Sequence, residues 1–259
     1  MTLLIDTHCH LADPQFDLDR DEVVKRAQDQ GVFPIILIST SLTDAYLSAK
    51  LAHHYDLYFA AGIHPHNADQ KENKYLDRLS SLLQDPRCVA VGEIGLDFYR
   101  LRADPQTQIS LLKEMLILAK ENRLPVILHN REAAEPLWEN LSHHSQVKAL
   151  FHCFSGSAEF ARRITDAGHL VSFAGNITYP RSPLLSVVKA TPLSNLIIET
   201  DAPYLAPQPV RSRRNEPAFI IHTAQYLSQV RGISYEELAT TTTRNTAQFF
   251  PALQQTLTI

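Results

Sequence analysis

The chain has 259 residues, of which 44% are hydrophobic and 20% are charged, with 8 glycines, 15 prolines and 3 cysteines. This composition excludes a collagen-like chain, a coiled coil, a low-complexity disordered protein and a small secreted domain held together by disulfides. Lysine and arginine number 24 against 28 aspartates and glutamates, a net charge of −4. The surface as a whole therefore repels phosphate, and an anionic substrate requires a local positive feature.

The chain carries no predicted targeting segment or membrane span. The stretch from Met1 to His8 lacks the basic start of a signal peptide, and no apolar run approaches the length that crosses a bilayer. Cys9, Cys88 and Cys153 are odd in number and form no C-x-x-C pair, which is typical of a reducing compartment. We expect a cytoplasmic protein without membrane association and without an obligate protein partner.

Short apolar runs recur along the chain and predict eight strands. They cover residues 3–6, 33–39, 57–62, 89–93, 126–129, 149–153, 170–173 and 196–201. Several are almost continuously apolar, as expected of parallel strands that are covered on both faces.

Helical patterns fill the intervals between these runs. Residues 17–29 carry a periodic apolar pattern that ends before Gly31, and Asp104-Pro105 is typical of a helix start. A further pattern covers residues 157–167, and Ser234 begins a capping box. Strands that alternate with helices fit either a closed (β/α)₈ barrel or an open doubly wound sheet. The strand number and chain length favour a TIM-like (β/α)₈ barrel, and no linker divides it, so we expect one domain over residues 1–259.

Metal-binding residue types follow the predicted strands at the point where each one ends. They are His8 and His10 after the first run, Glu93 after the fourth, His129 after the fifth, His152 after the sixth and Asp201 after the eighth. In a barrel these ends meet on one rim, where barrel enzymes place their active sites. Imidazole nitrogens and carboxylate oxygens suit divalent ions, so the sequence predicts a metal centre on this rim.

Two ions fit this set better than one. A catalytic Zn²⁺ usually takes three protein ligands and keeps one position open, so six ligands overfill a single site. With Glu93 bridging two divalent ions, such as Mg, Mn or Zn, each ion has at least three ligands and room for water. Two such ions also leave a net positive charge that attracts a phosphodiester despite the acidic surface.

These residues lie within motifs that resemble the TatD-type metal-dependent deoxyribonucleases of the amidohydrolase superfamily. The motifs occur in order along nearly the whole chain: IDTHCHL at 5–11, GIHPH at 62–66, VGEIGLDFY at 91–99, PVILH at 125–129, HCFSG at 152–156, ETDAPY at 199–204 and RNEP at 214–217. The resemblance implies a TIM-like barrel that hydrolyses phosphodiester bonds in DNA.

The same resemblance implies how the ligands divide. His8, His10 and Asp201 would hold one metal, His129 and His152 the other, and Glu93 would bridge them. Glu93 and Asp201 are the predicted catalytic residues, because a water between two cations loses its proton readily and Asp201 can accept that proton.

Substrate contacts are expected from residues around this rim. His64 and His66 follow the third strand, and the resemblance assigns His64 to the substrate phosphate. Arg131 could bind phosphate or support the fold. Arg213 and Arg214 belong to the one basic cluster, which lies in the Pro-rich loop at 203–217 and could either track phosphate or form a solvated surface.

Three further residues complete the predicted site. Tyr204 could stack on an unpaired base, and Asn215 is a candidate for substrate binding or, like Asp97, for orienting the ligands. The leading hypothesis is a metal-dependent exonuclease that acts on single-stranded DNA or on chain ends. The alternative is an amidohydrolase or esterase on the same barrel, such as a D-aminoacyl-tRNA deacylase, since the same ions polarise a carbonyl.

Overall fold

Eight parallel strands form one sheet in which neighbours in the sequence are neighbours in space, from β1 to β8. The computed structural model describes residues 3–70 and 73–255. The strands are β1 (Leu4–Cys9), β2 (Val32–Ile38), β3 (Tyr58–Ala61), β4 (Cys88–Asp97), β5 (Val126–Arg131), β6 (Ala149–Phe151), β7 (Leu170–Phe173) and β8 (Leu196–Ile198). All eight predicted strands are present, and their continuous apolar character reflects burial on both faces.

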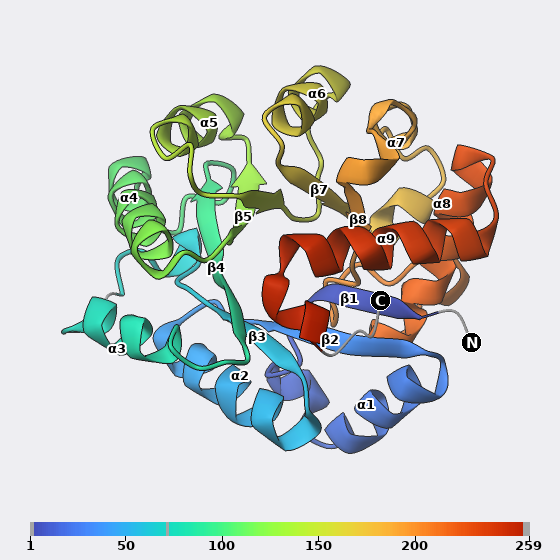
Figure 1. Cartoon of the computed structure of the whole chain (residues 1–259), viewed down its shortest axis with the longest axis horizontal. Helices are drawn as coiled ribbons and strands as arrows, with labels where there is room; N and C mark the ends of the chain where they lie inside the picture. Colours follow the sequence, from blue (N-terminus) through green and yellow to red (C-terminus); the bar gives the residue numbers. More distant parts are fainter. Residues whose placement is uncertain (1–2, 71–72, 256–259) are drawn as a thin grey trace.

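The sheet curls until its first and last strands meet. Cys9 forms a parallel bridge with Ala202, and the backbone N–H of His10 donates to the Ala202 carbonyl at 2.8 Å. The N–H of Asp201 donates to the carbonyl of His8 at 2.9 Å. This junction closes the ring, so the predicted (β/α)₈ barrel is confirmed over the open sheet, and residues from both ends of the chain lie beside each other (Figure 1).

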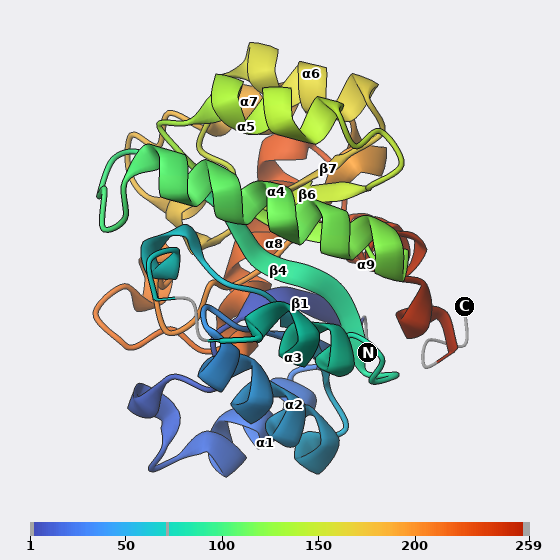
Figure 2. The same ribbon diagram turned by 90° about the vertical axis from the view of Figure 1, so that its left-hand side faces the viewer.

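Helices surround the strands on the outside (Figures 1 and 2). The α-helices are α1 (Arg20–Asp29), α2 (Leu42–Tyr55), α3 (Tyr75–Leu82), α4 (Pro105–Asn122), α5 (Ala134–Ser142), α6 (Ala158–Asp166), α7 (Leu185–Ala190), α8 (Ile220–Arg231) and α9 (Tyr235–Phe249). Short 3-10 helices are η1 (Pro14–Phe16), η2 (Pro65–Asn67), η3 (Gly175–Thr178), η4 (Leu193–Asn195), η5 (Gln208–Val210), η6 (Pro217–Phe219) and η7 (Pro251–Gln255). The predicted caps at Asp104 and Ser234 are confirmed, since each accepts hydrogen bonds from the first turn of its helix, and Ser157 caps α6 in the same way.

The interior of the barrel is apolar at one end and polar at the other. Ile5 and Val89, near the starts of their strands, pack in one cluster with Phe250 and Leu253 from the C-terminal segment. This cluster fills the end of the barrel at which the strands begin. The loops that follow the strands lie at the opposite end, so polar residues at the strand ends face one opening.

Within the described part of the chain, no helix is both long enough and apolar enough to cross a membrane.

Candidate metal centre

The six predicted metal ligands converge at the ends of their strands. They are His8 in β1, His10 directly after it, Glu93 in β4, His129 in β5, His152 directly after β6 and Asp201 after β8. Glu93 does not end its strand as predicted, because β4 continues to Asp97. Three overlapping groups of these side chains, one of which also includes His64, have ligand atoms within 4.8 Å of one another.

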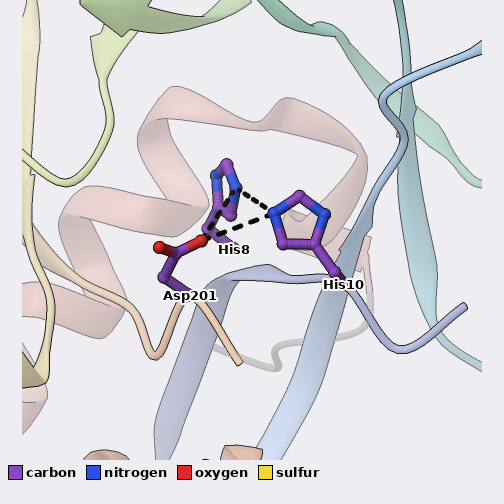
Figure 3. Close-up of side chains that lie close together, drawn as sticks. All are labelled: His8, His10 and Asp201. Carbon is purple, nitrogen blue, oxygen red and sulfur yellow. Dashed lines mark hydrogen bonds and ion pairs between the residues drawn. The ribbon is translucent and has the colours of Figure 1, made fainter. Parts of the chain in front are cut away.

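His8, His10 and Asp201 form the first of these groups, shown in Figure 3. Nε2 of His8 lies 3.2 Å from Nε2 of His10 and 3.6 Å from Oδ1 of Asp201, and the distance from His10 to Asp201 is 3.4 Å. Ligand atoms bound to one tetrahedral zinc ion at about 2.0–2.1 Å lie roughly 3.3 Å from one another. The three atoms therefore fit the coordination sphere of one divalent ion.

Glu93 lies between this group and a second one. Its Oε2 is 3.5 Å from Nε2 of His8 and 3.8 Å from Nε2 of His10. Its Oε1 is 2.8 Å from Nδ1 of His129 and 2.8 Å from Nε2 of His152. One carboxylate thus presents a different oxygen to each of two clusters of imidazoles, which is the arrangement of a bridging ligand.

His64 belongs to the same assembly. Its Nε2 lies 3.4 Å from Oε1 of Glu93, and its ring stands 4.5 Å from the ring of His129. His64, Glu93 and His129 form another of the groups with ligand geometry. Burial lowers the pKa of His64 to about 4, so its imidazole is neutral at neutral pH and able to bind a cation or donate to substrate.

The imidazoles and carboxylates of this cluster shift one another's pKa values toward the charged forms. Burial alone would raise the pKa of Glu93, but the charge of His152 and the hydrogen bonds from His129 and His152 hold it well below its usual value. Burial likewise opposes protonation of His10, yet the hydrogen bond and charge of Asp201 raise its pKa to about 9. Protons on the imidazoles thus balance the negative charge of the buried carboxylates, and a cation that binds here replaces those protons.

Close approach of β4 and β5 brings Glu93 and His129 together. Gly95 has a φ of +139°, and a Cβ at this position would lie 2.0 Å from the carbonyl oxygen of His129. Any side chain at Gly95 would therefore separate the two strands. Asp201 adopts a φ of 56°, a left-handed conformation unusual for aspartate, at the point where its carboxylate meets His8 and His10.

A buried carboxylate supports the first group from behind. Asp6 accepts hydrogen bonds from the Thr200 backbone N–H at 2.9 Å and from its hydroxyl at 2.5 Å, and from the N–H of His8 at 3.3 Å. Burial raises the pKa of Asp6 to about 7. Asp6 therefore ties the strand that carries His8 to the segment that carries Asp201.

A second buried carboxylate supports His152. Glu199 accepts hydrogen bonds from the Ser172 hydroxyl at 2.5 Å and from the Cys153 N–H at 2.7 Å, and its Oε1 lies 3.4 Å from Nδ1 of His152. Sequence reasoning missed the roles of Asp6 and Glu199. The available signal was an acidic residue inside an apolar strand pattern.

Asp97 orients the opposite side of the centre, as predicted for a residue that supports the ligands. Its Oδ2 lies 2.7 Å from Nε2 of His66 and 3.3 Å from Nε2 of His129. Its Oδ1 accepts the backbone N–H groups of Tyr99 and Arg100. The strand that holds Glu93 therefore also fixes the start of the loop between β4 and α4.

A cavity of about 530 Å³ opens over the metal centre. Of the predicted substrate residues, His64, His66 and Tyr204 line it. Arg100 and Arg102 also line it, although sequence reasoning missed both. The sequence feature that could have identified them is a pair of arginines shortly after the VGEIGLDFY motif.

Four other residues predicted to bind substrate lie away from this cavity. Arg131 stacks on the ring of Tyr99 at 4.0 Å, and Arg213 lies 4.7 Å from the ring of Phe219. Arg131 does not line the cavity. Arg213 and Arg214, which belong to the basic cluster of the Pro-rich loop, do not line it either.

Arg214 and Asn215 hold the loop after β8 in place. Arg214 pairs with Asp19 at 2.7 Å, across the start of α1. Asn215 is fully buried, and its amide donates to the carbonyl oxygens of Thr200 and Tyr204. Neither side chain lines the cavity, and the contacts of Asn215 hold the segment from Thr200 to Tyr204 that carries Asp201, as expected of a residue that orients the ligands.

Comparison with known proteins agrees with this geometry. Residues 5–251 match the family described as TatD related DNase. The chain belongs to the TatD related DNase family. It is 34% identical over 252 residues to the "uncharacterized metal-dependent hydrolase YabD" of Bacillus subtilis, covering 96% of this chain and 99% of that protein.

Two further TatD relatives match this chain over almost the whole length of both proteins. The "3'-5' ssDNA/RNA exonuclease TatD" of Erwinia tasmaniensis is 35% identical over 257 residues, covering 95% of this chain and 99% of that protein. The crystal structure of YjjV, a TatD homologue from Escherichia coli, superposes with a TM-score of 0.89 at 35% identity, covering 96% of this chain and 98% of that one. The chain is therefore a metal-dependent hydrolase of this family that acts on phosphoester bonds, as its sequence predicts.

Proposed function

We propose that this TatD-family hydrolase is an exonuclease that removes nucleotides from the 3′ end of single-stranded DNA and uses two divalent cations. The observation that carries the proposal is the position of Glu93, whose two carboxylate oxygens face two different groups of imidazoles. The names of relatives that are about 35% identical support a single-stranded substrate and the 3′ end.

His8, His10 and Asp201 would hold one cation, His129 and His152 the other, and Glu93 would bridge them. Cations bound there supply an acidified water and neutralise the charge of the phosphate. With cations bound, Asp201 would accept a proton from the attacking water, since its carboxylate is ionised: His10 and His8 hold its pKa below the usual value despite burial.

Side chains on the neighbouring loops bind the substrate. His66 is held by Asp97 at 2.7 Å, so its ring is fixed toward the cavity. Arg100 and Arg102 are exposed, line the cavity and form no ion pair with any residue in the described ranges, so their guanidinium groups are available for phosphate. These cations supply the local positive feature that an acidic chain requires for a nucleic acid.

The proposal is tested with the metal-loaded protein and a single-stranded oligonucleotide labelled at its 5′ end. A blunt duplex of the same sequence and an RNA strand serve as comparison substrates, each with and without a chelator. We expect a ladder that shortens from the 3′ end of the single strand, slower loss of the duplex, and no cleavage with chelator. Two metal equivalents per chain are expected by elemental analysis.

Absence of cleavage with Mg, Mn and Zn would overturn the proposal. Release of an amino acid from an aminoacyl ester under the same conditions would instead identify a carbonyl hydrolase on this barrel. A single metal equivalent in a fully active protein would contradict the bridging role of Glu93.

We also propose that residues 1–259 act as one catalytic domain in the cytoplasm. All eight strands belong to one sheet, and the three cysteines are free, with Cys9 and Cys88 buried. Free thiols are typical of a reducing compartment.

A further inference from the structure

The cavity over the metal centre has two sides of opposite charge. The cationic side carries Arg100 and Arg102 beside His66, on the loops that follow β3 and β4, and burial lowers the pKa of His66, which leaves its imidazole neutral. These loops are neighbours because β3 and β4 are neighbours in the sheet, and the charge of Arg102 acts on His66. This side attracts phosphate.

The acidic side consists of Asp13 and Asp44, on the segments that follow β1 and β2. The two carboxylates lie close enough for the charge of Asp13 to raise the pKa of Asp44, to which burial contributes most. The loop that follows β8 adds Tyr204 to this side, and β8 adjoins β1 in the closed barrel. The acidic side therefore lies on the loops that follow β8, β1 and β2, next to the loops that carry His66, Arg100 and Arg102.

Hydrogen bonds fix both acidic side chains in place. Asp13 accepts from the backbone N–H of Gln15 at 2.9 Å and from the Tyr204 hydroxyl at 3.2 Å. Oδ2 of Asp44 accepts from the Thr40 N–H at 2.8 Å and from the Thr40 hydroxyl at 3.1 Å. Within residues 3–70 and 73–255, neither carboxylate pairs with a lysine or an arginine, so both carry their charge into the cavity.

We propose that Asp44 and Asp13 make this cavity select strands with a free 3′-hydroxyl and reject strands with a 3′-phosphate. The inference rests on the proposed exonuclease function. The strand that remains after cleavage follows the cationic side, where its phosphates meet Arg100 and Arg102. The terminal nucleoside then lies against the acidic side.

A terminal hydroxyl suits this position and a terminal phosphate does not. The hydroxyl can donate to Asp44, whose Oδ1 accepts no hydrogen bond from any residue that the structure describes. A phosphate there would bring its charge against two carboxylates that are held rigidly. Like charges juxtaposed in a binding site are a means of rejecting the wrong ligand.

The test compares two oligonucleotides of one sequence, both labelled at the 5′ end, one with a 3′-hydroxyl and one with a 3′-phosphate. The measured quantity is the initial rate at which the first nucleotide is lost. The wild-type protein should favour the hydroxyl end by about tenfold or more, as expected for like charges a few ångströms apart. Asp44→Asn keeps the shape and the acceptor for Thr40 but removes the charge, and should lower this ratio at least about threefold.

Two variants complete the design. Asp13→Asn should lower the same ratio, and it serves in place of Asp44→Asn if circular dichroism shows that the latter does not fold. Asp166→Asn is the matched control, because Asp166 is an exposed residue at the end of α6, outside the cavity, and its loss changes the net charge equally. This control should leave the ratio unchanged.

Inhibition by small nucleotides provides a second readout. Thymidine 5′-monophosphate mimics the terminal nucleotide, and thymidine 3′,5′-bisphosphate adds the phosphate that the acidic side should repel. The monophosphate should inhibit the wild type more strongly, and this difference should shrink in Asp44→Asn.

Equal rates on the two oligonucleotides would overturn the inference while leaving the exonuclease function intact. A preference that persists unchanged in folded Asp44→Asn and Asp13→Asn would also overturn the role of these carboxylates. Absence of any shortening of either strand would instead contradict the proposed function itself.

Discussion

Glu199 lies directly behind His152, with Oε1 of the carboxylate 3.4 Å from Nδ1 of the imidazole. The other nitrogen of the same ring lies 2.8 Å from Glu93. His152 is therefore held between two buried carboxylates, and its pKa is raised well above the usual value although burial opposes this. A carboxylate behind a metal-binding imidazole fixes the ring and strengthens its basicity.

The first prediction concerns this pair. Glu199→Gln should weaken metal binding by about 10- to 100-fold, because the amide cannot support the imidazole as the carboxylate does. The measurement is a titration of metal into the chelator-treated protein in the presence of a competing indicator. Glu159→Gln, on the exposed surface of α6, is the control. Unchanged affinity in Glu199→Gln would show that the carboxylate only supports the fold.

Glu93 and Asp201 should differ in how many metals they hold. Glu93→Gln should reduce turnover at least about 100-fold and lower the occupancy of both metal positions, because its two oxygens face both groups. Asp201→Asn should also reduce turnover but weaken only one position, since Asp201 contacts His8 and His10 alone among the ligands. Elemental analysis after gel filtration gives the occupancy. Two full equivalents in Glu93→Gln would contradict the bridging arrangement.

Arg100 and Arg102 should contribute to affinity for the strand and not to the hydrolysis itself. Alanine at either position should raise KM for single-stranded DNA and reduce the slope of log affinity against log salt by about 1 for each phosphate that is no longer bound. Steady-state kinetics and binding at several salt concentrations measure both. Arg213→Ala is the control, since Arg213 lies over the ring of Phe219 outside the cavity. An equal effect of Arg213→Ala would place the phosphate path elsewhere.

Gln108 should hold the loop that carries these arginines. It is fully buried in α4, where Oε1 accepts the N–H of Asp97 at 2.8 Å and Nε2 donates to the carbonyl oxygens of Asp97 and Ala103. Gln108→Leu keeps the volume but leaves three buried backbone groups without partners, which should lower the free energy of unfolding by about 2–4 kcal/mol.

Urea denaturation measures this change, and KM should rise together with the loss of stability because the loop is no longer fixed. The matched control is Gln106→Leu, at an exposed position near the start of the same helix. A loss of stability without any change in KM would separate the loop from substrate binding.

His169 should make stability depend on pH independently of the metal centre. Burial, with a contribution from Lys148, lowers its pKa to about 4, and its Nδ1 accepts the N–H of Ala149 at 3.2 Å. The unfolded chain therefore binds a proton more readily than the folded one. Stability from this group is complete above about pH 6.5 and is lost as the pH falls toward 4, by as much as about 3 kcal/mol.

His169→Asn retains an acceptor for the Ala149 N–H and removes the titrating ring, so the difference from wild type should shrink as the pH falls from 6.5 to 4. Urea denaturation at several pH values measures this difference. The exposed His54 provides the control substitution, His54→Asn. Parallel stability curves for wild type and His169→Asn would exclude this role.

The candidate metal centre could be predicted from the sequence because its ligands lie within or directly after strands, and strands that are parallel in a barrel end on one rim. Glu93, His129 and His152 needed no knowledge of side-chain direction beyond this rule. Glu199 and Asp6 were missed because their role depends on partners in other strands, such as Ser172 and Thr200, which no local pattern reveals.

Which loop residues face the cavity was harder to predict, because this also depends on partners that are distant in the sequence. Arg214 looked like part of a phosphate-binding cluster, but it pairs with Asp19, which is 195 residues away in the sequence. Arg100 and Arg102 lie in a less basic segment, yet they face the cavity because Asp97 and Gln108 fix the start of that loop. A count of positive charges cannot distinguish these cases, whereas the ion pairs of the folded chain can.

The junction between β1 and β8 has a consequence for the synthesis of this protein. His8 and His10 are synthesised before the seven strands that follow β1, whereas their partner Asp201 follows only after all eight strands have been made. A nascent chain that stops before the end of β8 therefore lacks the carboxylate that completes the first group of candidate ligands. The barrel ring and the first group of candidate ligands therefore become complete in the same event.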